Sequence, residues 1–250
     1  MKIAKNNTND KRLWAVLLLA GLGLAGEASA TLIDRGNGMI YDTDLNITWL
    51  QDANLAQTNT FGVSGIISGF FMAWDTAQNW IAAMNAANYL GFNDWRLPST
   101  TDTGTPGCNF AYSGTDCGYN MNPGTSELAH LFFVELGNQS WVKSDGSSNA
   151  GNCSNYSSPF CLVNAGLFTN VQLGNYWSGT DYTPNTGDAW FFDTALGNQG
   201  SCPKGCEFLA WAVRTGDVAA NVPEPASLAL LGAGLAGLMG VRRRRGWPVL

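Results

Sequence analysis

The stretch Asp94-Trp95-Arg96-Leu97-Pro98-Ser99 lies between two segments that have the hydrophobic spacing of helices. Before it, apolar side chains recur every three or four positions over residues 74–89, and Gly91 is placed to end a helix. After it, residues 126–136 show the same spacing, with a serine at their start that can cap a helix. The sequence therefore predicts two helices that flank a tryptophan-bearing link.

Short runs of apolar, aromatic and β-branched residues surround this helical part and predict strands. They lie at residues 39–41, 47–50, 176–178, 189–193 and 209–214. After the first run, Asp42, Asp44 and Asn46 alternate as in the first half of a calcium loop, but the glycine and distal glutamate of an EF-hand are absent. We therefore expect a turn that is capped by its own aspartate side chains.

The chain between its two ends is about 192 residues long, enough for one domain with its own core. Residues 31–221 hold five basic and sixteen acidic side chains, which gives a net charge of −11. This charge repels phosphate backbones and sulfated polymers, so we expect no nucleic-acid partner. A bound cation or a neutral glycan fits the charge better.

All six cysteines lie in this central part of the chain. They are Cys108, Cys117, Cys153, Cys161, Cys202 and Cys206. An even number of cysteines in an exported segment indicates disulfides, and several pairings are possible. Pairing of sequence neighbours would give three small loops rather than one bridge across the core. The alternative is a metal site, although no cysteine has a histidine at ligand spacing.

Residues 1–30 have the three parts of a secretory signal peptide. A basic start precedes an uncharged apolar stretch at 13–26, and Ala28-Ser29-Ala30 supplies the small residues that signal peptidase requires. We expect cleavage after Ala30. The alternative is an uncleaved anchor, but an apolar stretch of about 14 residues is short for a membrane span of roughly 20.

The last 29 residues combine a Pro223-Glu224-Pro225 break, an apolar run at 226–241 and the cluster Arg242-Arg243-Arg244-Arg245. The glycines of the run suit a membrane helix, and the arginines would stay in the cytoplasm. We therefore predict a precursor held in the inner membrane, with residues 31–222 outside. The alternative is a buried C-terminal helix that is followed by a basic tail.

This order resembles the PEP-CTERM sorting signal, here residues 222–250. The resemblance implies that an exosortase recognises the tail and cuts the chain near Pro-Glu-Pro. It also implies passage to the cell surface or the exopolysaccharide matrix of a Gram-negative bacterium, so the membrane helix would be transient.

A second resemblance is carried by motifs that follow one another along the chain. They are Ile47-Thr48-Trp49, Asp94-Trp95-Arg96-Leu97-Pro98, Glu127-Leu128, Tyr176-Trp177-Ser178-Gly179-Thr180, Ala189-Trp190 and Ala212-Val213-Arg214. In this order they resemble the Lcl C-terminal domain family, and we assign residues 31–221 to such a domain. The resemblance implies an α+β, C-type-lectin-like fold, with two helices packed on a small, loop-rich antiparallel sheet. The chain departs from the family by disulfide-stapled insertions at about 100–124 and 143–159.

The founding member of that family is an adhesin domain that binds sulfated glycans. Adhesion is therefore implied here, while the scarcity of lysine and arginine leaves the ligand open. Our candidate ligand site is the loop from Asp181 to Asp188. There Tyr182 and the neighbouring Trp190 could stack on a sugar, and the oxygens of Asp181, Asn185 and Asp188 could hold hydroxyls or a structural calcium ion.

Little in the sequence points to catalysis, and we expect no catalytic residue and no cofactor. His130 is the one histidine, and we interpret it as a surface or half-buried residue of the second helix. Most tryptophans should be core residues, as we expect for Trp49, Trp95, Trp177 and Trp211, and Arg96 should pair with a buried acid.

The sequence therefore favours an exported, exosortase-sorted surface or matrix protein that binds extracellular polysaccharide and is not an enzyme. One alternative is a purely structural biofilm-matrix component. The other is an extracellular glycan hydrolase with a carboxylate pair, because the sequence does not give the separations of its sixteen acids.

Overall fold

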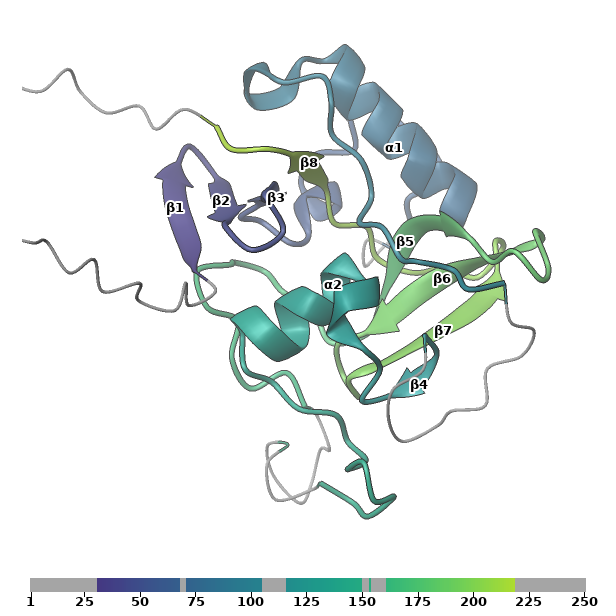
Figure 1. Ribbon diagram of the computed structural model, residues 1–250. Helices are drawn as coiled ribbons and strands as arrows, with labels where there is room; N and C mark the ends of the chain where they lie inside the picture. The colour runs from purple at the N-terminus through teal and green to yellow at the C-terminus, as the bar shows by residue number, and fades with distance from the viewer. Residues whose placement is uncertain (1–30, 68–70, 105–115, 150–152, 154–160, 219–250) are drawn as a thin grey trace, which may run out of the picture.

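The computed structural model describes residues 31–67, 71–104, 116–149, 153 and 161–218. The predicted signal peptide with Ala28 and Ala30, Cys108, and the sorting signal with its apolar run at 226–241 lie outside these ranges. Among the described residues, no helix has the length and apolar character needed to cross a membrane. The described part is α+β, with two small antiparallel sheets and two main helices (Figure 1).

The N-terminal sheet has the strand order β1-β2-β3-β8. Its strands are β1 (Leu32–Gly36), β2 (Met39–Asp42), β3 (Ile47–Leu50) and β8 (Val213–Thr215). The turn between β2 and β3 is closed by Asp42, whose Oδ1 accepts hydrogen bonds from the backbone N–H groups of Asp44 (3.1 Å) and Leu45 (3.0 Å). The predicted aspartate-capped turn is confirmed.

The C-terminal sheet has the strand order β4-β7-β6-β5. Its strands are β4 (Gly118–Tyr119), β5 (Asn175–Asp181), β6 (Asp188–Asp193) and β7 (Asn198–Pro203). The sequence predicted one small sheet, so the presence of two is a correction. The sequence did not predict β7, because its residues Asn-Gln-Gly-Ser-Cys-Pro include no β-branched or aromatic side chain. Pairing with β6 along the whole length of β7 holds this strand in the sheet.

The segment before β8 connects the two sheets, and only its end is a strand. Leu209 exchanges backbone hydrogen bonds with β5, donating to Asn175 O and accepting from Trp177 N, both at 2.9 Å. Ala212 then accepts a backbone hydrogen bond from Leu50 at the end of β3 (3.0 Å). The strand predicted at residues 209–214 is therefore shorter, because the chain changes sheets within it.

Both predicted helices exist, with changed ends. The first, α1 (Trp74–Ala86), stops before Asn88 and Leu90, which take left-handed φ values of 50° and 55°. The second begins as α2 (Glu127–His130), where Ser126 Oγ accepts the hydrogen bond of Ala129 N–H as a cap. It continues as a π-helical turn, η4 (Leu131–Glu135). Three short 3₁₀ turns are the other helical elements of the described residues: η1 (Leu55–Gln57), η2 (Tyr89–Gly91) and η3 (Pro123–Thr125).

The tryptophans that were predicted to be buried form the core. Trp49, Trp95, Trp177 and Trp211 are at most 2% exposed. Trp211 lies among other rings, with centroids 5.2 Å from Trp49, 4.9 Å from Phe168 and 5.6 Å from Tyr176. The indole N–H groups of these four tryptophans all have acceptors, which removes the cost of burying a polar group.

The link at residues 94–99 fastens distant parts of the chain together. Asp94 holds Arg214 by two hydrogen bonds of 2.9 Å, and the Arg96 backbone pairs with Val213, the first residue of β8. The Arg96 guanidinium makes two hydrogen bonds of 2.7 Å to Glu127 at the start of α2. The expected pairing of Arg96 with an acid is confirmed. The motif serves the architecture, so a ligand site has to be sought elsewhere.

Two of the neighbour disulfides are present, Cys153–Cys161 and Cys202–Cys206. Cys117 is also disulfide-bonded, and its sequence neighbour Cys108 lies outside the described residues. The first bridge closes the second insertion, and the second closes the end of β7. The two described bridges are therefore small loop staples, as the spacing predicted.

Candidate functional site

The loop predicted to bind ligand is the hairpin turn between β5 and β6. Most of its polar side chains form ion pairs or hydrogen bonds within the protein. Asp181 pairs with Lys204 Nζ at 2.6 Å, and Asn185 Nδ2 donates to Asp188 Oδ1 at 3.1 Å. Tyr182 and Trp190 contact each other edge to face, with ring centroids 5.2 Å apart. The structure thus brings the predicted residues together.

The two aromatic rings of this loop are buried, with Tyr182 6% and Trp190 1% exposed, and they form a small cluster with Cys117. A sugar stacks on an open aromatic face, so these rings do not offer the stacking platform that we expected. The exposed groups of the loop are polar or small. Ligand binding by this loop stays a prediction.

Asp102 is a residue of this region that the sequence did not single out. Its carboxylate accepts hydrogen bonds from Trp190 Nε1 (3.0 Å), Thr183 N (2.5 Å) and Gly104 N (2.7 Å), and so ties the first insertion to the hairpin. Burial raises the pKa of Asp102, but the hydrogen bonds from Thr183, Gly104 and Trp190 outweigh it and lower the pKa overall. No short motif could have revealed a contact across 88 residues.

A polar groove of about 350 Å³ lies elsewhere, beside the second helix and the second insertion. Its walls carry four amide side chains, two hydroxyls, one lysine and one half-buried ring. The lining residues are Asn120, Phe133, Asn138, Gln139, Ser140, Lys143, Ser144 and Asn149. Among the described residues that line it there is no carboxylate, although the predicted exported domain is strongly acidic.

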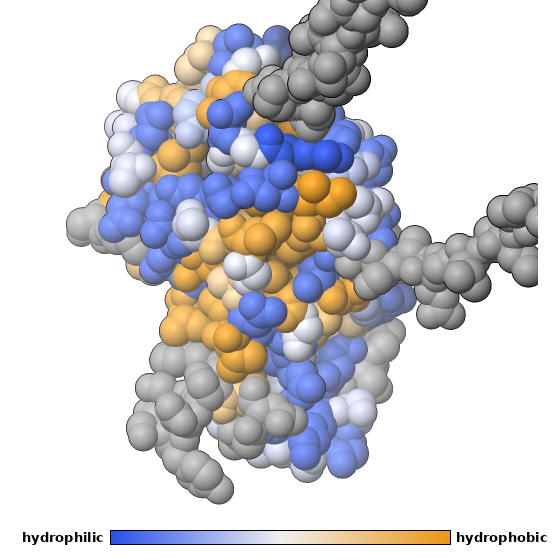
Figure 2. All heavy atoms as spheres, turned by 90° about the vertical axis from the view of Figure 1, so that its left-hand side faces the viewer, coloured by the Kyte–Doolittle hydropathy of each residue, from blue (hydrophilic) through white to orange (hydrophobic). Residues whose placement is uncertain are grey.

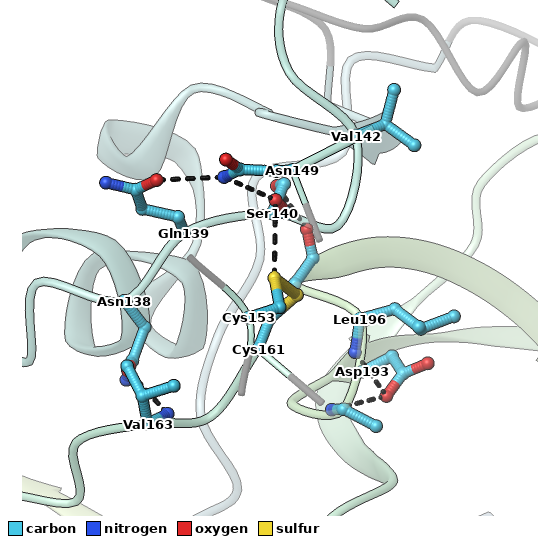
Figure 3. The surroundings of a disulfide bond; sticks show 12 residues. Asn138, Gln139, Ser140, Val142, Asn149, Cys153, Cys161, Val163, Asp193 and Leu196 are labelled. Atoms are coloured by element: carbon cyan, nitrogen blue, oxygen red, sulfur yellow. Dashed lines mark hydrogen bonds between the residues drawn. A yellow bond between two sulfur atoms is a disulfide. The ribbon is translucent and has the colours of Figure 1, made fainter. Parts of the chain in front are cut away.

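The Cys153–Cys161 disulfide lies next to the groove residue Ser140, whose backbone oxygen is 3.9 Å from Cys153 Sγ (Figure 3). Asn149 Nδ2 donates to Ser140 O (3.0 Å) and to Gln139 Oε1 (2.8 Å), and Cys153 N donates to Asn149 O (3.2 Å). The other half of the bridge is anchored to the C-terminal sheet, because Cys161 N donates to Ala195 O (2.8 Å). These bonds fix Asn149 and Cys153 beside the groove and tie Cys161 to the turn that follows β6.

The amide side chains of Asn138 and Asn120 fix another part of the groove's lining. Asn138 Oδ1 accepts hydrogen bonds from the backbone of Val163 (3.0 Å) and Asn164 (2.9 Å). Asn120 Nδ2 donates to Val142 O (2.6 Å), and Asn120 N donates to Ser140 Oγ (3.0 Å). A groove with walls fixed in this way is preorganised, which lowers the entropy cost of binding a ligand.

Lys143 is the basic side chain of the groove. Arg35, Arg96, Lys204 and Arg214 each pair with a carboxylate. Within the residues that the structure describes, Lys143 makes no salt bridge shorter than 4 Å, although its charge acts on the exposed Asp145 two residues further on. The groove thus holds a solvent-accessible cation beside its amides and hydroxyls.

A separate cluster lies where the β2–β3 turn meets the second helix. Asp42, His130 and Glu135 each place one oxygen or nitrogen atom within 4.8 Å of the others. The His130 side chain is 12% exposed, in keeping with the half-buried helix position that we predicted, and that of Glu135 is 1% exposed. Burial, then the charges of Asp42 and Asp44, raise the pKa of Glu135 to about 7.

One face of the molecule is rich in apolar surface. Figure 2 shows it from the side that lies at the left of Figure 1, with apolar residues gathered across the middle. The exposed large apolar side chains of the described part are Ile67, Val134, Val163, Leu167 and Leu173. A face of this kind favours contact with another molecule over free exposure to water.

Comparison with known families finds two matches along the chain. Residues 38–105 match the family model of the Lcl C-terminal domain, and residues 221–245 match that of the PEP-CTERM protein-sorting motif. None of the curated proteins and none of the solved structures matches the chain. The sorting motif marks the chain as an exported surface protein that is processed by an exosortase from a membrane-anchored precursor.

Proposed function

We propose that this protein binds extracellular polysaccharide at the cell surface or in the surrounding matrix, without turning it over. Export would begin with the signal peptide at residues 1–30, and the tail would be lost after sorting. The domain at 31–221 would then act as a C-type-lectin-like module. The sorting motif and the Lcl-type match support this role, and the two helices with two small antiparallel sheets are compatible with such a fold.

The observation that carries the proposal is the polar groove. The exposed side chains of Gln139, Lys143 and Ser144 can exchange hydrogen bonds with sugar hydroxyls, and the half-buried ring of Phe133 gives the groove an apolar wall. The amides and hydroxyl of Asn138, Ser140 and Asn149 are buried and bonded within the protein. The absence of carboxylates among its lining residues sets it apart from the strongly acidic domain around it. Lys143 adds one positive charge, which suits a neutral glycan or one with an occasional acidic sugar.

A bulky substitution in the groove tests the proposal. The full chain, kept in mild detergent, is measured on an array of neutral, uronic-acid and sulfated polysaccharides, with and without calcium. We expect binding to neutral or weakly acidic polymers that Ser144→Trp abolishes, because the indole would fill the groove. Thr186→Trp is the matched control, since Thr186 is an exposed residue of the hairpin loop.

The outcomes separate the competing interpretations. Loss of binding in Thr186→Trp alone would return the site to the loop predicted from the sequence. Binding that needs calcium would favour the acidic side chains of that loop over the groove. If the wild-type chain binds no glycan above background, the lectin role is wrong and the alternative of a structural matrix component is favoured.

A further inference from the structure

The cluster of Asp42, His130 and Glu135 depends on an irregular helical turn. In an α-helix, residues five apart point about 140° away from each other, so His130 and Glu135 would not meet. Here the chain makes a π-helical turn, closed by the hydrogen bond from Leu136 N to Leu131 O (2.9 Å). His130 Nε2 then lies 3.5 Å from Glu135 Oε1. Single π-helical turns are uncommon and occur frequently at functional sites.

Two buried atoms in this cluster have no hydrogen-bond partner among the described residues. They are His130 Nε2 and Glu135 Oε1. A buried carboxylate normally accepts hydrogen bonds, because burial without a partner costs free energy. The side chain of Glu135 is 99% buried and directs its unpartnered oxygen at the imidazole. Two further carboxylates are close: Asp42 belongs to the cluster, and Asp44 Oδ2 lies 3.7 Å from His130 Nε2.

From this arrangement we propose that Asp42, His130 and Glu135 bind one divalent transition-metal ion of the zinc type. In a tetrahedral zinc site with metal–ligand distances of about 2.1 Å, neighbouring ligand atoms are about 3.4 Å apart. The separation of 3.5 Å between His130 Nε2 and Glu135 Oε1 fits this geometry. Two carboxylates balance the charge of the ion, and the fourth position is open to water or to Asp44.

The ligand chemistry separates zinc from calcium. Calcium binds six to eight oxygen atoms, whereas an imidazole with two carboxylates suits zinc and related ions. Asp42 is also held in place for this role. Its Oδ1 accepts two backbone hydrogen bonds of the turn, and among the described residues its Oδ2 accepts only a long one from Trp49 Nε1 (3.4 Å). Such outer contacts orient metal ligands.

A metal ion bound at this site would cross-link two parts of the fold. Asp42 ends β2 in the N-terminal sheet, whereas His130 and Glu135 belong to the helical segment that packs on the C-terminal sheet through Phe132 and Phe192 (ring centroids 5.2 Å apart). A bound ion would therefore join the two halves of the domain. This inference does not depend on glycan binding, because none of the three ligands lines the polar groove.

The test uses the full chain without an affinity tag, stripped with EDTA and kept in mild detergent. Titration calorimetry should show one equivalent of Zn²⁺ bound, and Zn²⁺ in excess should raise the unfolding midpoint by about 5 °C or more. Co²⁺ gives a second readout, because tetrahedral coordination produces strong visible absorption. Ca²⁺ at the same concentration should have a much smaller effect.

Glu135→Gln and Glu207→Gln are the matched variants. Glu207 is an exposed acid outside the cluster, so its substitution should leave Zn²⁺ binding unchanged. Glu135→Gln keeps the side-chain shape and should weaken Zn²⁺ at least about tenfold, with loss of the Co²⁺ absorption. His130→Gln should do the same. The proposal is wrong if wild type shows no stoichiometric Zn²⁺ binding, or if Glu135→Gln binds as wild type does.

Discussion

Glu127 and Glu135 stand at the two ends of one helical segment, and both carboxylates are largely buried, at 14% and 1% side-chain exposure. Glu127 accepts two hydrogen bonds from the Arg96 guanidinium and one from Ser99 N, all at 2.7 Å. Glu135 Oε1 accepts none among the described residues and faces a histidine and two aspartates. The Glu127 carboxylate makes its hydrogen bonds within the fold, whereas the Glu135 carboxylate keeps an oxygen that a ligand can contact. Substitutions at the two positions should therefore have opposite effects on stability.

The largest effect is expected at Glu127. Glu127→Ala leaves the Arg96 guanidinium half-buried without its partner and removes the acceptor of Ser99 N, so the free energy of unfolding should fall by about 2 to 3 kcal/mol. In a domain of this size this lowers the unfolding midpoint by roughly 5 to 10 °C. Thermal unfolding followed by circular dichroism measures it, with Glu207→Ala as the control. A shift no larger than that of the control would mean that the pair does not hold the fold.

A smaller loss of unfolding free energy is expected at Asp102. Like Glu127, its carboxylate accepts hydrogen bonds within the protein. Asp102→Asn removes the charge that Trp190, Thr183 and Gly104 hold in place, at a cost of about 1 to 2 kcal/mol at pH 7.

The pH dependence of this cost identifies its cause. Because the pKa of Asp102 is lower in the folded protein than its usual value near 3.8, the stabilisation is present above pH 4 and disappears as the pH falls through the folded pKa. The difference between Asp102→Asn and wild type should therefore shrink in acid, as urea unfolding from pH 7 down to pH 3 can show. A difference that is independent of pH would assign the loss to packing instead.

The part of this comparison that concerns the fold could be predicted from the sequence. Helical periodicity over residues 74–89 predicted the first helix, and the buried face of α1 includes Ile81 and Met84. A lone arginine next to a core tryptophan indicated an acid partner, and Glu127 is that partner. Neighbouring cysteines indicated small loops, and Cys153–Cys161 and Cys202–Cys206 form them. In each case the signal is local or follows from the charge and burial of a single residue.

The candidate sites could not be predicted, because they are made by tertiary contacts. Asp42 and His130 are 88 positions apart and meet only because the β2–β3 turn lies against the second helix. The π-helical turn that aligns His130 with Glu135 leaves no periodic signal of its own. Trp190 was predicted to stack on a sugar because it is aromatic and neighbours the loop from Asp181 to Asp188. Its indole N–H is instead bonded to Asp102, and its ring is buried.

The smallest effect, and the one of opposite sign, is expected at Glu135 in metal-free protein. At pH 8, above its raised pKa of about 7, the folded protein carries a buried negative charge beside Asp42 and Asp44. Glu135→Gln removes that repulsion and keeps the shape of the side chain, so the EDTA-treated variant should be more stable than wild type by about 1 kcal/mol. Saturating Zn²⁺ should reverse the order, because only wild type keeps all three ligands. Urea unfolding of both proteins with EDTA and with Zn²⁺ measures the reversal. Destabilisation by Glu135→Gln in EDTA, as expected for Glu127→Ala, would make Glu135 a structural residue and remove the contrast between the two ends of the helix.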